Sequence, residues 1–569
     1  MFPVSLFSVT ARLARLSSSA LLYGLGLSMA SAQSVAPITT EPTARSAPTL
    51  PTVAAQAIRA HAEFLSSDLL EGRATGSRGY ELAAAYVAAQ FRQYGLTPAG
   101  AEGGFFKSVP LIEATAVLPG SSLVLRNEGT TEFDFGKDYI PSVNFFNASS
   151  GLSAPMVFAG FGIEAPEYKY NDLADLDLQG KIAVILEGAP ERLNDEVRNV
   201  YGWPETKFAS LSKAGAIGVI EIHPANEKGL GNAQNSWERI SAMSWVSQMR
   251  KINTEGQPDE RFPELKLKFR LNAAAAVPLF ANSGRSFEQV MQAAKASEVE
   301  GFTLAGTVTM SATTGLRRME SNNVLGLIRG SDAKLQQEYI LIAAHLDGLG
   351  RGSAVNGDST YNGLQRNAVG VAMMLEMARA IAAMPSKPKR SIIFAAVTAG
   401  EKEAQGLGAL LNDGSAQSRN IVSAVVLDTP LPVTRTSDVI GIGADQSSMG
   451  NRLVAAAQQQ NLRMVLSDDV ENSVLVSSLA PLVKAGIPVL ALRGGNRARD
   501  GRNVLSIKNN WLQQHINHPS DDLSNTPLDS AAARELVNLN VATVLDLAND
   551  ADRPVWYRSS LAYRKLSRD

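Results

Sequence analysis

Residues 339–347 read YILIAAHLD, and residues 390–401 read RSIIFAAVTAGE. Each stretch is a short apolar run rich in β-branched residues that leads into a charged one, which is typical of strands that a parallel sheet buries on both faces. The same half of the chain contains three further runs of this kind: Val324–Ile328, Val422–Leu427 and Val489–Leu492. An amphipathic stretch at Val369–Met384 predicts a helix between two of the runs. From about residue 321 onward, the sequence therefore predicts a doubly wound α/β domain.

Polar side chains follow three of the predicted strands. His345 with Asp347 comes after the first strand, Glu401 after the second and Asp428 after the third. In open α/β sheets, binding sites collect beyond the carboxyl ends of the strands, and zinc accepts histidine nitrogen and carboxylate oxygen. The pattern is typical of a zinc hydrolase. The alternative is that each polar residue simply begins a solvated loop.

Composition narrows the possible functions. The chain has 569 residues, of which 45% are hydrophobic and 19% charged, so a large folded core is expected. Its 53 basic and 55 acidic residues lack the positive excess of a nucleic-acid binder. The absence of cysteine excludes disulfides, thiolate nucleophiles and cysteine-bound zinc. Five histidines leave few places for imidazole chemistry.

The N-terminus is typical of an export signal. Arg12 and Arg15 precede an apolar run at Ala20–Met29, and Ala30-Ser31-Ala32 is a small-x-small cleavage site. We therefore predict a signal peptide over 1–32, cleaved after Ala32, and a flexible leader over 33–54 rich in Ser, Thr, Pro and Ala. No later segment is apolar enough to span a membrane. The mature protein is expected to be periplasmic or secreted.

The first half of the mature chain has a different texture. A helical pattern runs from about His61 to Gly100, and strand-like runs at Lys181–Leu186 and Ile217–Ile222 flank a helical stretch at Phe208–Ala214. Strand, helix and strand in this order indicate a second α/β unit. The polar region that follows, from Trp237 to Lys268, is predicted to be a solvated surface elaboration.

Several segments together resemble a known family. They are FLSSDLLEGRATGSRGYELAAAYVAAQFRQYGLTPAG (64–100), FAGFGIEAPEYKYNDLADLDLQGKIAVIL (158–186), AAHLDGLG (343–350), GDSTYNGLQRNAVGVAMMLEMARA (357–380), RSIIFAAVTAGEK (390–402), VVLDTPLP (425–432) and HPSDDL (518–523). In this order they resemble the zinc aminopeptidases of metallopeptidase family 28, specifically the exported bacterial members with a protease-associated insertion. The resemblance implies a peptidase-like domain of doubly wound mixed or parallel sheet over 55–130 plus 311–550, an inserted protease-associated α/β domain over 131–310, and a C-terminal tail over 551–569.

The resemblance also implies a metal site. In the family, one His and one Asp hold a first zinc ion, one Glu and one His hold a second, an Asp bridges both, and a further Glu is the general base. His345 and Asp428 match zinc ligands, and Glu401 matches the second residue of the family's Glu-Glu pair. Asp347 matches a partner that orients His345.

Two positions of this site depart from the family. The run NGLQRN at 362–367 aligns with a family run such as NG-x-x-D-N, which places Arg366 at the bridging aspartate. Gly400 stands at the general base. A guanidinium beside two divalent ions adds repulsion where a shared anion is required.

The last zinc ligand is ambiguous. Anchoring the alignment on the run 519–522 places Asn517 at the family's final histidine, whereas a one-residue slip makes His518 the ligand. The remnant ligand set is therefore His345, Asp428, Glu401 and, with the slip, His518.

These departures lead to a hypothesis and an alternative. The hypothesis is a catalytically impaired pseudo-peptidase, in which Arg366 balances the charge of Asp428 and Glu401 in place of zinc, and which binds a peptide or a protein partner. The alternative is a working aminopeptidase with an altered or single-zinc site, in which Glu401 or Glu403 acts as base. A metal-independent hydrolase built on Thr398 or Ser477-Ser478 has less support, because no motif places a histidine beside either hydroxyl.

Overall fold

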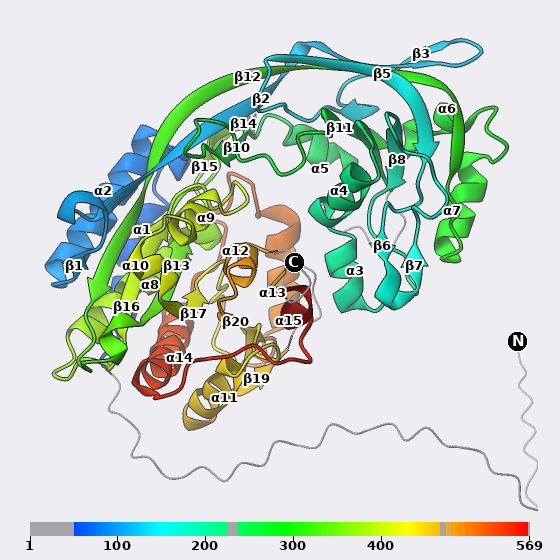
Figure 1. Cartoon of the computed structure of the whole chain (residues 1–569). Coiled ribbons are helices and arrows are strands. Elements are labelled where there is room, and N and C mark those ends of the chain that lie inside the picture. The colour runs from blue at the N-terminus through cyan, green and yellow to red at the C-terminus, as the bar shows by residue number, and fades with distance from the viewer. Residues whose placement is uncertain (1–50, 225–235, 467–473, 476, 567–569) are drawn as a thin grey trace, which may run out of the picture. The chain divides into compact units, whose positions relative to one another are not determined.

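The computed structural model describes residues 51–224, 236–466, 474–475 and 477–566 (Figure 1). Residues Leu50–Asp569 form one compact unit. The predicted signal peptide and residues 33–50 of the predicted leader lie outside the described residues. Among the helices that are described, none combines the length and apolar character needed to cross a membrane.

Two groups of elements make up the described chain. The first group, which flanks the predicted insertion, consists of α1 (Ala55–Leu65), α2 (Arg78–Gln93), β1 (Thr97–Pro98), β13 (Tyr339–His345), β14 (Gly350–Val355), β15 (Asp358–Tyr361), α8 (Val369–Ala382), β16 (Ser391–Val397), α9 (Gln405–Leu411), α10 (Ala416–Arg419), β17 (Ile421–Val426), β18 (Asp438–Ile442), α11 (Met449–Gln459), β19 (Arg463–Val465), α12 (Ala480–Lys484), β20 (Val489–Gly494), α13 (Val504–Gln514), α14 (Ser530–Asn549) and α15 (Leu561–Leu566). The second group consists of β2 (Phe106–Arg126), β3 (Thr130–Glu132), β4 (Tyr139–Ile140), β5 (Ser149–Phe158), β6 (Glu164–Ala165), β7 (Tyr170–Asn171), β8 (Ile182–Leu186), α3 (Asp195–Tyr201), α4 (Pro204–Lys213), β9 (Gly218–His223), α5 (Trp237–Ala242), β10 (Gln248–Lys251), β11 (Leu267–Asn272), α6 (Val277–Phe280), α7 (Phe287–Lys295) and β12 (Phe302–Ile328).

The first group is built on a mixed sheet, which confirms the predicted fold class. Its strand order is β19-β18-β20-β17-β13-β16, and β12 of the second group pairs with β16. The four central strands β20, β17, β13 and β16 are parallel, whereas β18 and β12 pair antiparallel on either side of them. All five apolar runs that predicted strands lie within strands of this sheet or extend one residue beyond them.

Both faces of this sheet are buried because its strands alternate between two cores. Along β13, Ile340, Ile342 and Ala344 pack into a core that includes residues of α1, α2, α8, α11 and α14. Leu341 and Ala343 of the same strand pack into a second core that includes residues of α9 and α12. A strand buried on both sides has no solvated face, so polar side chains are left to the strand ends.

Two long strands join the two groups. β2 and β12 pair antiparallel from Phe106 opposite Val324 to Arg126 opposite Thr307, and they lie side by side in Figure 1. β12 pairs with β16 at one end and with β5 at the other, so the sheet of the first group continues into β5-β8-β9-β11. A separate hydrophobic core, drawn mostly from residues between Leu123 and Ala312, packs in this second group.

The region from Trp237 to Lys268 is only in part the solvated elaboration that its polar sequence predicts: residues such as Glu255 and Glu264 are exposed, but others are buried. Trp237 is 8% exposed, and its indole N–H donates to the carbonyl of Gly136 at 2.8 Å. β10 pairs antiparallel with β2, and the ring of Trp245 lies 5.2 Å from that of Tyr361. The polar sequence hides these contacts because their partners lie more than 100 residues away in the chain.

We predict that Arg390→Met destabilises the fold strongly. The Arg390 side chain is fully buried, its Nε donates to Glu338 at 2.7 Å, and its Nη1 donates to the Leu547 carbonyl at 3.0 Å, near the end of α14. Glu338 is 16% exposed and keeps Arg553 as a partner, so the main cost is about 1–3 kcal/mol for each buried carbonyl that loses its donor. Arg553, which is 62% exposed and pairs with the same Glu338, is the matched control, and Arg553→Met should cost less than about 1 kcal/mol. Urea unfolding of both variants measures the difference, and equal losses would contradict this role for Arg390.

Candidate functional site

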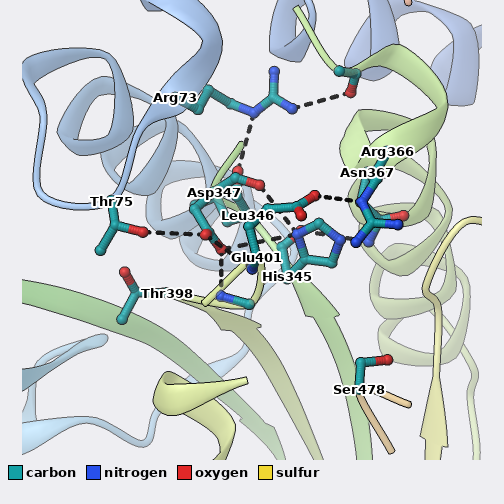
Figure 2. Close-up of polar contacts among 12 residues, drawn as sticks. Arg73, Thr75, His345, Leu346, Asp347, Arg366, Asn367, Thr398, Glu401 and Ser478 are labelled. Atoms are coloured by element: carbon teal, nitrogen blue, oxygen red, sulfur yellow. Dashed lines mark hydrogen bonds and ion pairs between the residues drawn. The ribbon is translucent and has the colours of Figure 1, made fainter. Parts of the chain in front are cut away.

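The side chains predicted from the strand ends lie close together: Figure 2 shows His345, Asp347 and Glu401, and Asp428 lies 3.5 Å from His345. His345 ends β13 and is 6% exposed. Its Nδ1 lies 3.1 Å from the backbone carbonyl of Asp347, and its Nε2 lies 3.5 Å from Oδ1 of Asp428. The backbone carbonyl of Asp347 is thus the group that orients the imidazole. The carboxylate of Asp347 is farther away, with Oδ1 at 3.8 Å from Nδ1 of His345.

Asp428 follows β17 and has both carboxylate oxygens engaged. Oδ1 accepts from the hydroxyl of Thr429 at 2.9 Å and faces His345, while Oδ2 accepts from the hydroxyl of Ser478. Burial works against the charge of both partners, but their mutual contact outweighs it. The pKa of Asp428 is held well below its usual range by His345, and the pKa of His345 is raised to about 9 mainly by Asp428. At neutral pH, this is an imidazolium–carboxylate pair.

Arg366 and Glu401 form the second ion pair of the site. Nε of Arg366 donates to Oε1 of Glu401 at 2.7 Å, and the Glu401 side chain is 4% exposed. Burial would raise the pKa of Glu401, but the charges of Arg366 and His345 lower it below its ordinary value. Arg366 lies in the π-type turn η7 (Leu364–Ala368), which Gly363 enters with a φ of +61°. A Cβ on that glycine would lie 2.4 Å from the carbonyl oxygen of Arg366, so the turn requires glycine here.

Asp521 holds the backbone of this turn through hydrogen bonds. Its carboxylate accepts the backbone N–H groups of Gln365 at 3.1 Å and Arg366 at 3.2 Å, and the indole N–H of Trp511 at 3.1 Å. Burial raises the pKa of Asp521 to about 6 despite these hydrogen bonds. The quoted segment HPSDDL contains this residue, but its local pattern does not predict a partner more than 150 positions away.

Asp347 organises the turn that carries Glu401. Its fully buried carboxylate accepts the backbone N–H of Gly400 at 2.7 Å, that of Glu401 at 3.2 Å and the hydroxyl of Thr75 at 3.1 Å. A Cβ added to Gly400 would lie 2.1 Å from the Cβ of His345. The backbone at the family's general-base position therefore has no room for a glutamate unless His345 or the turn shifts.

A second arginine, Arg73, holds the loops around the site. It is 1% exposed and donates to the carbonyls of Leu346 at 3.0 Å, Asn362 at 2.8 Å and Gly363 at 3.1 Å. Burial lowers the pKa of Arg73 to about 10, so it stays charged at neutral pH. The run 64–100 carries the family resemblance, but its local pattern does not predict this role for Arg73, because the contact with Leu346 spans 273 positions.

His518 and Asn517 are the candidates for the family's last zinc ligand. Among the described residues, their side chains make no hydrogen bond to His345, Asp428, Glu401 or Arg366. His518 Nδ1 lies 2.7 Å from the hydroxyl of Ser520, which His515 also approaches at 2.8 Å. Burial lowers the pKa of His518. Asn517 has a φ of +51°, and its buried Oδ1 has no hydrogen-bond partner among the described residues.

These donors do not fit a pair of zinc ions. Both oxygens of Asp428 are engaged, and Glu401 is paired with a guanidinium that is permanently charged. Within the part of the chain that the structure describes, no group of three or more His, Asp or Glu side chains is placed to hold a metal ion.

The hydroxyl groups considered as nucleophiles are engaged elsewhere. The Thr398 hydroxyl lies 2.6 Å from that of Ser321, and Thr398 is fully buried. The Ser478 hydroxyl donates to Asp428. A carboxylate contact orients a serine hydroxyl without the imidazole base that activates it in serine hydrolases.

Comparison with known proteins confirms the family resemblance. Residues 323–542 match the family model described as Peptidase family M28. The structure is similar to that of an aminopeptidase from Aneurinibacillus sp. strain AM-1, with a TM-score of 0.52 and 19% sequence identity over 88% of this chain and 95% of that chain.

Two further structures resemble the chain more weakly. One is BSAP, a zinc aminopeptidase from Bacillus subtilis, with a TM-score of 0.44 and 16% identity over 90% of this chain and 98% of that one. The other is a peptidase M28 precursor from Shewanella amazonensis SB2B, with a TM-score of 0.43 and 16% identity over 88% and 98%.

We predict that the contribution of His345 to stability falls as the pH rises. Its pKa of about 9 in the folded protein lies above the value near 6.5 expected for the unfolded chain, so the folded state binds the proton more tightly. The stabilisation, of up to about 3 kcal/mol, is complete below about pH 6.5 and is lost as the pH rises through 9.

The measurement is urea unfolding of the natural protein and of His345→Gln between pH 6 and pH 9.5. The difference in unfolding free energy should shrink steadily with pH. A difference that stays constant over this range would show that the imidazole is neutral in the folded protein.

Proposed function

We propose that this chain, whose residues 323–542 are a segment of the M28 peptidase type, is an exported pseudo-peptidase that no longer hydrolyses peptides through zinc and instead binds a peptide or protein ligand. The observation that carries the proposal is the hydrogen bond from Arg366 to the buried carboxylate of Glu401. It places a fixed positive charge at the position that the family resemblance assigns to an anion shared by two metal ions.

Electrostatics makes this charge incompatible with the family's chemistry. Charges within a few ångströms in a partly buried site interact by several kcal/mol, so the guanidinium opposes each divalent ion as strongly as a bridging carboxylate would favour it. Gly400 removes the general base as well, a group that typically contributes 10²–10⁴-fold to the rate. Either change impairs turnover, and together they remove both the metal and the proton acceptor.

The same charges support binding. The side chain of Arg366 is 32% exposed, so part of the guanidinium at this edge of the sheet reaches solvent beside its ion pair with Glu401. A peptide offers carboxylate and carbonyl oxygens that a guanidinium binds. The similar fold of an aminopeptidase supports a peptide as the ligand class.

The direct test is zinc content and turnover of the mature chain, residues 33–569, purified from medium containing zinc. We expect zinc well below one ion per chain after gel filtration, and no release of nitroaniline from a panel of aminoacyl-nitroanilides beyond that of buffer. Two tightly held zinc ions with steady turnover would contradict the proposal. One zinc ion with turnover would support the alternative of a single-zinc aminopeptidase.

We further predict that Arg366→Asp raises zinc affinity, whereas Arg366→Met does not. Both changes remove the cation, but only aspartate supplies the oxygen donors that zinc accepts. Zinc titration of the two variants and the natural protein separates these effects. Equal affinity in all three would show that residue 366 does not control metal binding. Gly400 is left unchanged in this test because a side chain there would clash with His345.

A further inference from the structure

The second group of elements carries charged side chains on a sheet face where apolar packing is expected. β8, β9 and β11 are parallel, and α4 covers part of one face, where Leu211 packs in a small core with Val219. Farther along the same face, Glu221 of β9 lies opposite Arg270 of β11, and Lys268 lies opposite Val219. A parallel sheet is normally buried by apolar residues on both faces, so this charged part of the face needs an explanation.

The charged face forms one side of a cavity of about 630 Å³. The opposite side comes from the first group of elements, with Gly408 and Leu411 of α9 and Pro481 of α12. The volume lies within the range of small-molecule sites, and such sites occur preferentially where two parts of a protein meet.

One oxygen of Glu221 lacks a hydrogen-bond donor among the described residues. Glu221 is 3% exposed, and its Oε1 accepts no hydrogen bond from them. Two cations balance the charge of the carboxylate at longer range: Lys207 Nζ lies 3.6 Å from Oε1, and Arg270 Nε lies 3.8 Å from Oε2. A buried carboxylate oxygen without a hydrogen bond is costly, and a ligand that donates an N–H group to Oε1 removes that cost.

Two cations on the same face have similarly long carboxylate contacts. Lys268 Nζ is 3.8 Å from Glu260, and Arg270 is 3.8 Å from Glu221. Their side chains are 21% and 38% exposed, so both reach the open part of the cavity. Arginine and lysine at such positions receive carboxylates, with arginine able to bind both oxygens.

The spacing of these groups selects the ligand. Glu221 and Arg270 are register partners on adjacent strands, which lie about 4.8 Å apart. Because Arg270 Nε also lies only 3.8 Å from Glu221 Oε2, an ammonium and a carboxylate that bind at these two groups lie close together, as they do on the α-carbon of one amino acid. Trp203, Phe208 and Phe262 line the same cavity and provide apolar surface for a side chain.

We infer that this cavity binds a free α-amino acid with an apolar side chain, with its ammonium at Glu221, its carboxylate at Arg270 and Lys268, and its side chain against the aromatic residues. This site is distinct from the ion-pair network that contains Arg366, and its existence does not depend on the proposed function. The same end-group chemistry exists in a short peptide with free termini, but there the two charges are separated by at least one residue.

The test is calorimetric titration of the mature chain with L-leucine, N-acetyl-leucine, leucinamide and trileucine. Leucine should bind, while blocking either charged group should weaken binding at least tenfold, because each loses a charge-assisted contact. Weaker binding of trileucine supports the free amino acid, whereas equal or tighter binding overturns that choice in favour of a short peptide. No binding of leucine, or equal binding of the blocked compounds, overturns the site. This panel needs no variant.

Variants then locate the site. Glu221→Gln and Arg270→Gln should each weaken leucine binding at least tenfold. The matched controls are Glu300→Gln and Arg285→Gln, which break an exposed ion pair that does not line the cavity and should leave the affinity unchanged. If Arg366→Met loses leucine binding while Glu221→Gln retains it, the amino acid binds beside Arg366 instead, and the assignment is overturned. Thermal unfolding of each variant confirms that the compared proteins are folded.

Discussion

The ion pair between Arg366 and Glu401 determines which ligands the side chains at the sheet edge can bind, because it neutralises a carboxylate that is almost completely buried. A second pair, between His345 and Asp428, lies beside it and is held by the same balance of charge. The surrounding loops serve these pairs: Asp347 fixes the backbone of Glu401, and Asp521 fixes that of Arg366. The result is a compact network of complementary charges, in which adding metal ions would require the existing partners to separate.

The second group of elements is tied to the same loops. Arg250 of β10 pairs with Glu403 at 2.9 Å, and Lys402 donates to the carbonyl of Ser247 at 2.7 Å. Two contacts from the segment 247–250 therefore hold the turn after Glu401. Arg239 of α5 donates to the carbonyl of Gln513 at 2.9 Å, near the loop that contains Asn517. The proposed amino-acid cavity lies on the same boundary, since Glu403 also lines it. Both proposed binding regions therefore share the turn that follows β16.

The fold was more accessible from the sequence than the site. Strands such as Tyr339–His345 are buried on both faces, so residues 340–344 are all apolar and the pattern is local. The convergence of His345, Glu401 and Asp428 follows from the parallel strands that carry them. The roles of Arg73, Thr75 and Asp521 were not predictable, because their contacts join segments more than 150 positions apart. The burial of Trp237 was not predictable from its polar neighbours in sequence, because the residues that contact it lie far away in the chain. The domain boundaries drawn at 131 and 310 remain a prediction; β2 ends before the first boundary, and β12 runs across the second.

The central claim is that the guanidinium of Arg366 occupies the position of a shared metal-bridging anion and neutralises Glu401. Crystals of the mature protein grown with excess zinc, with diffraction recorded on both sides of the zinc absorption edge, test it most directly. We expect no anomalous peak among His345, Glu401 and Asp428, and we expect the Arg366 side chain to be hydrogen-bonded to Glu401. Two peaks a few ångströms apart at that position, with Arg366 turned toward solvent, would contradict it.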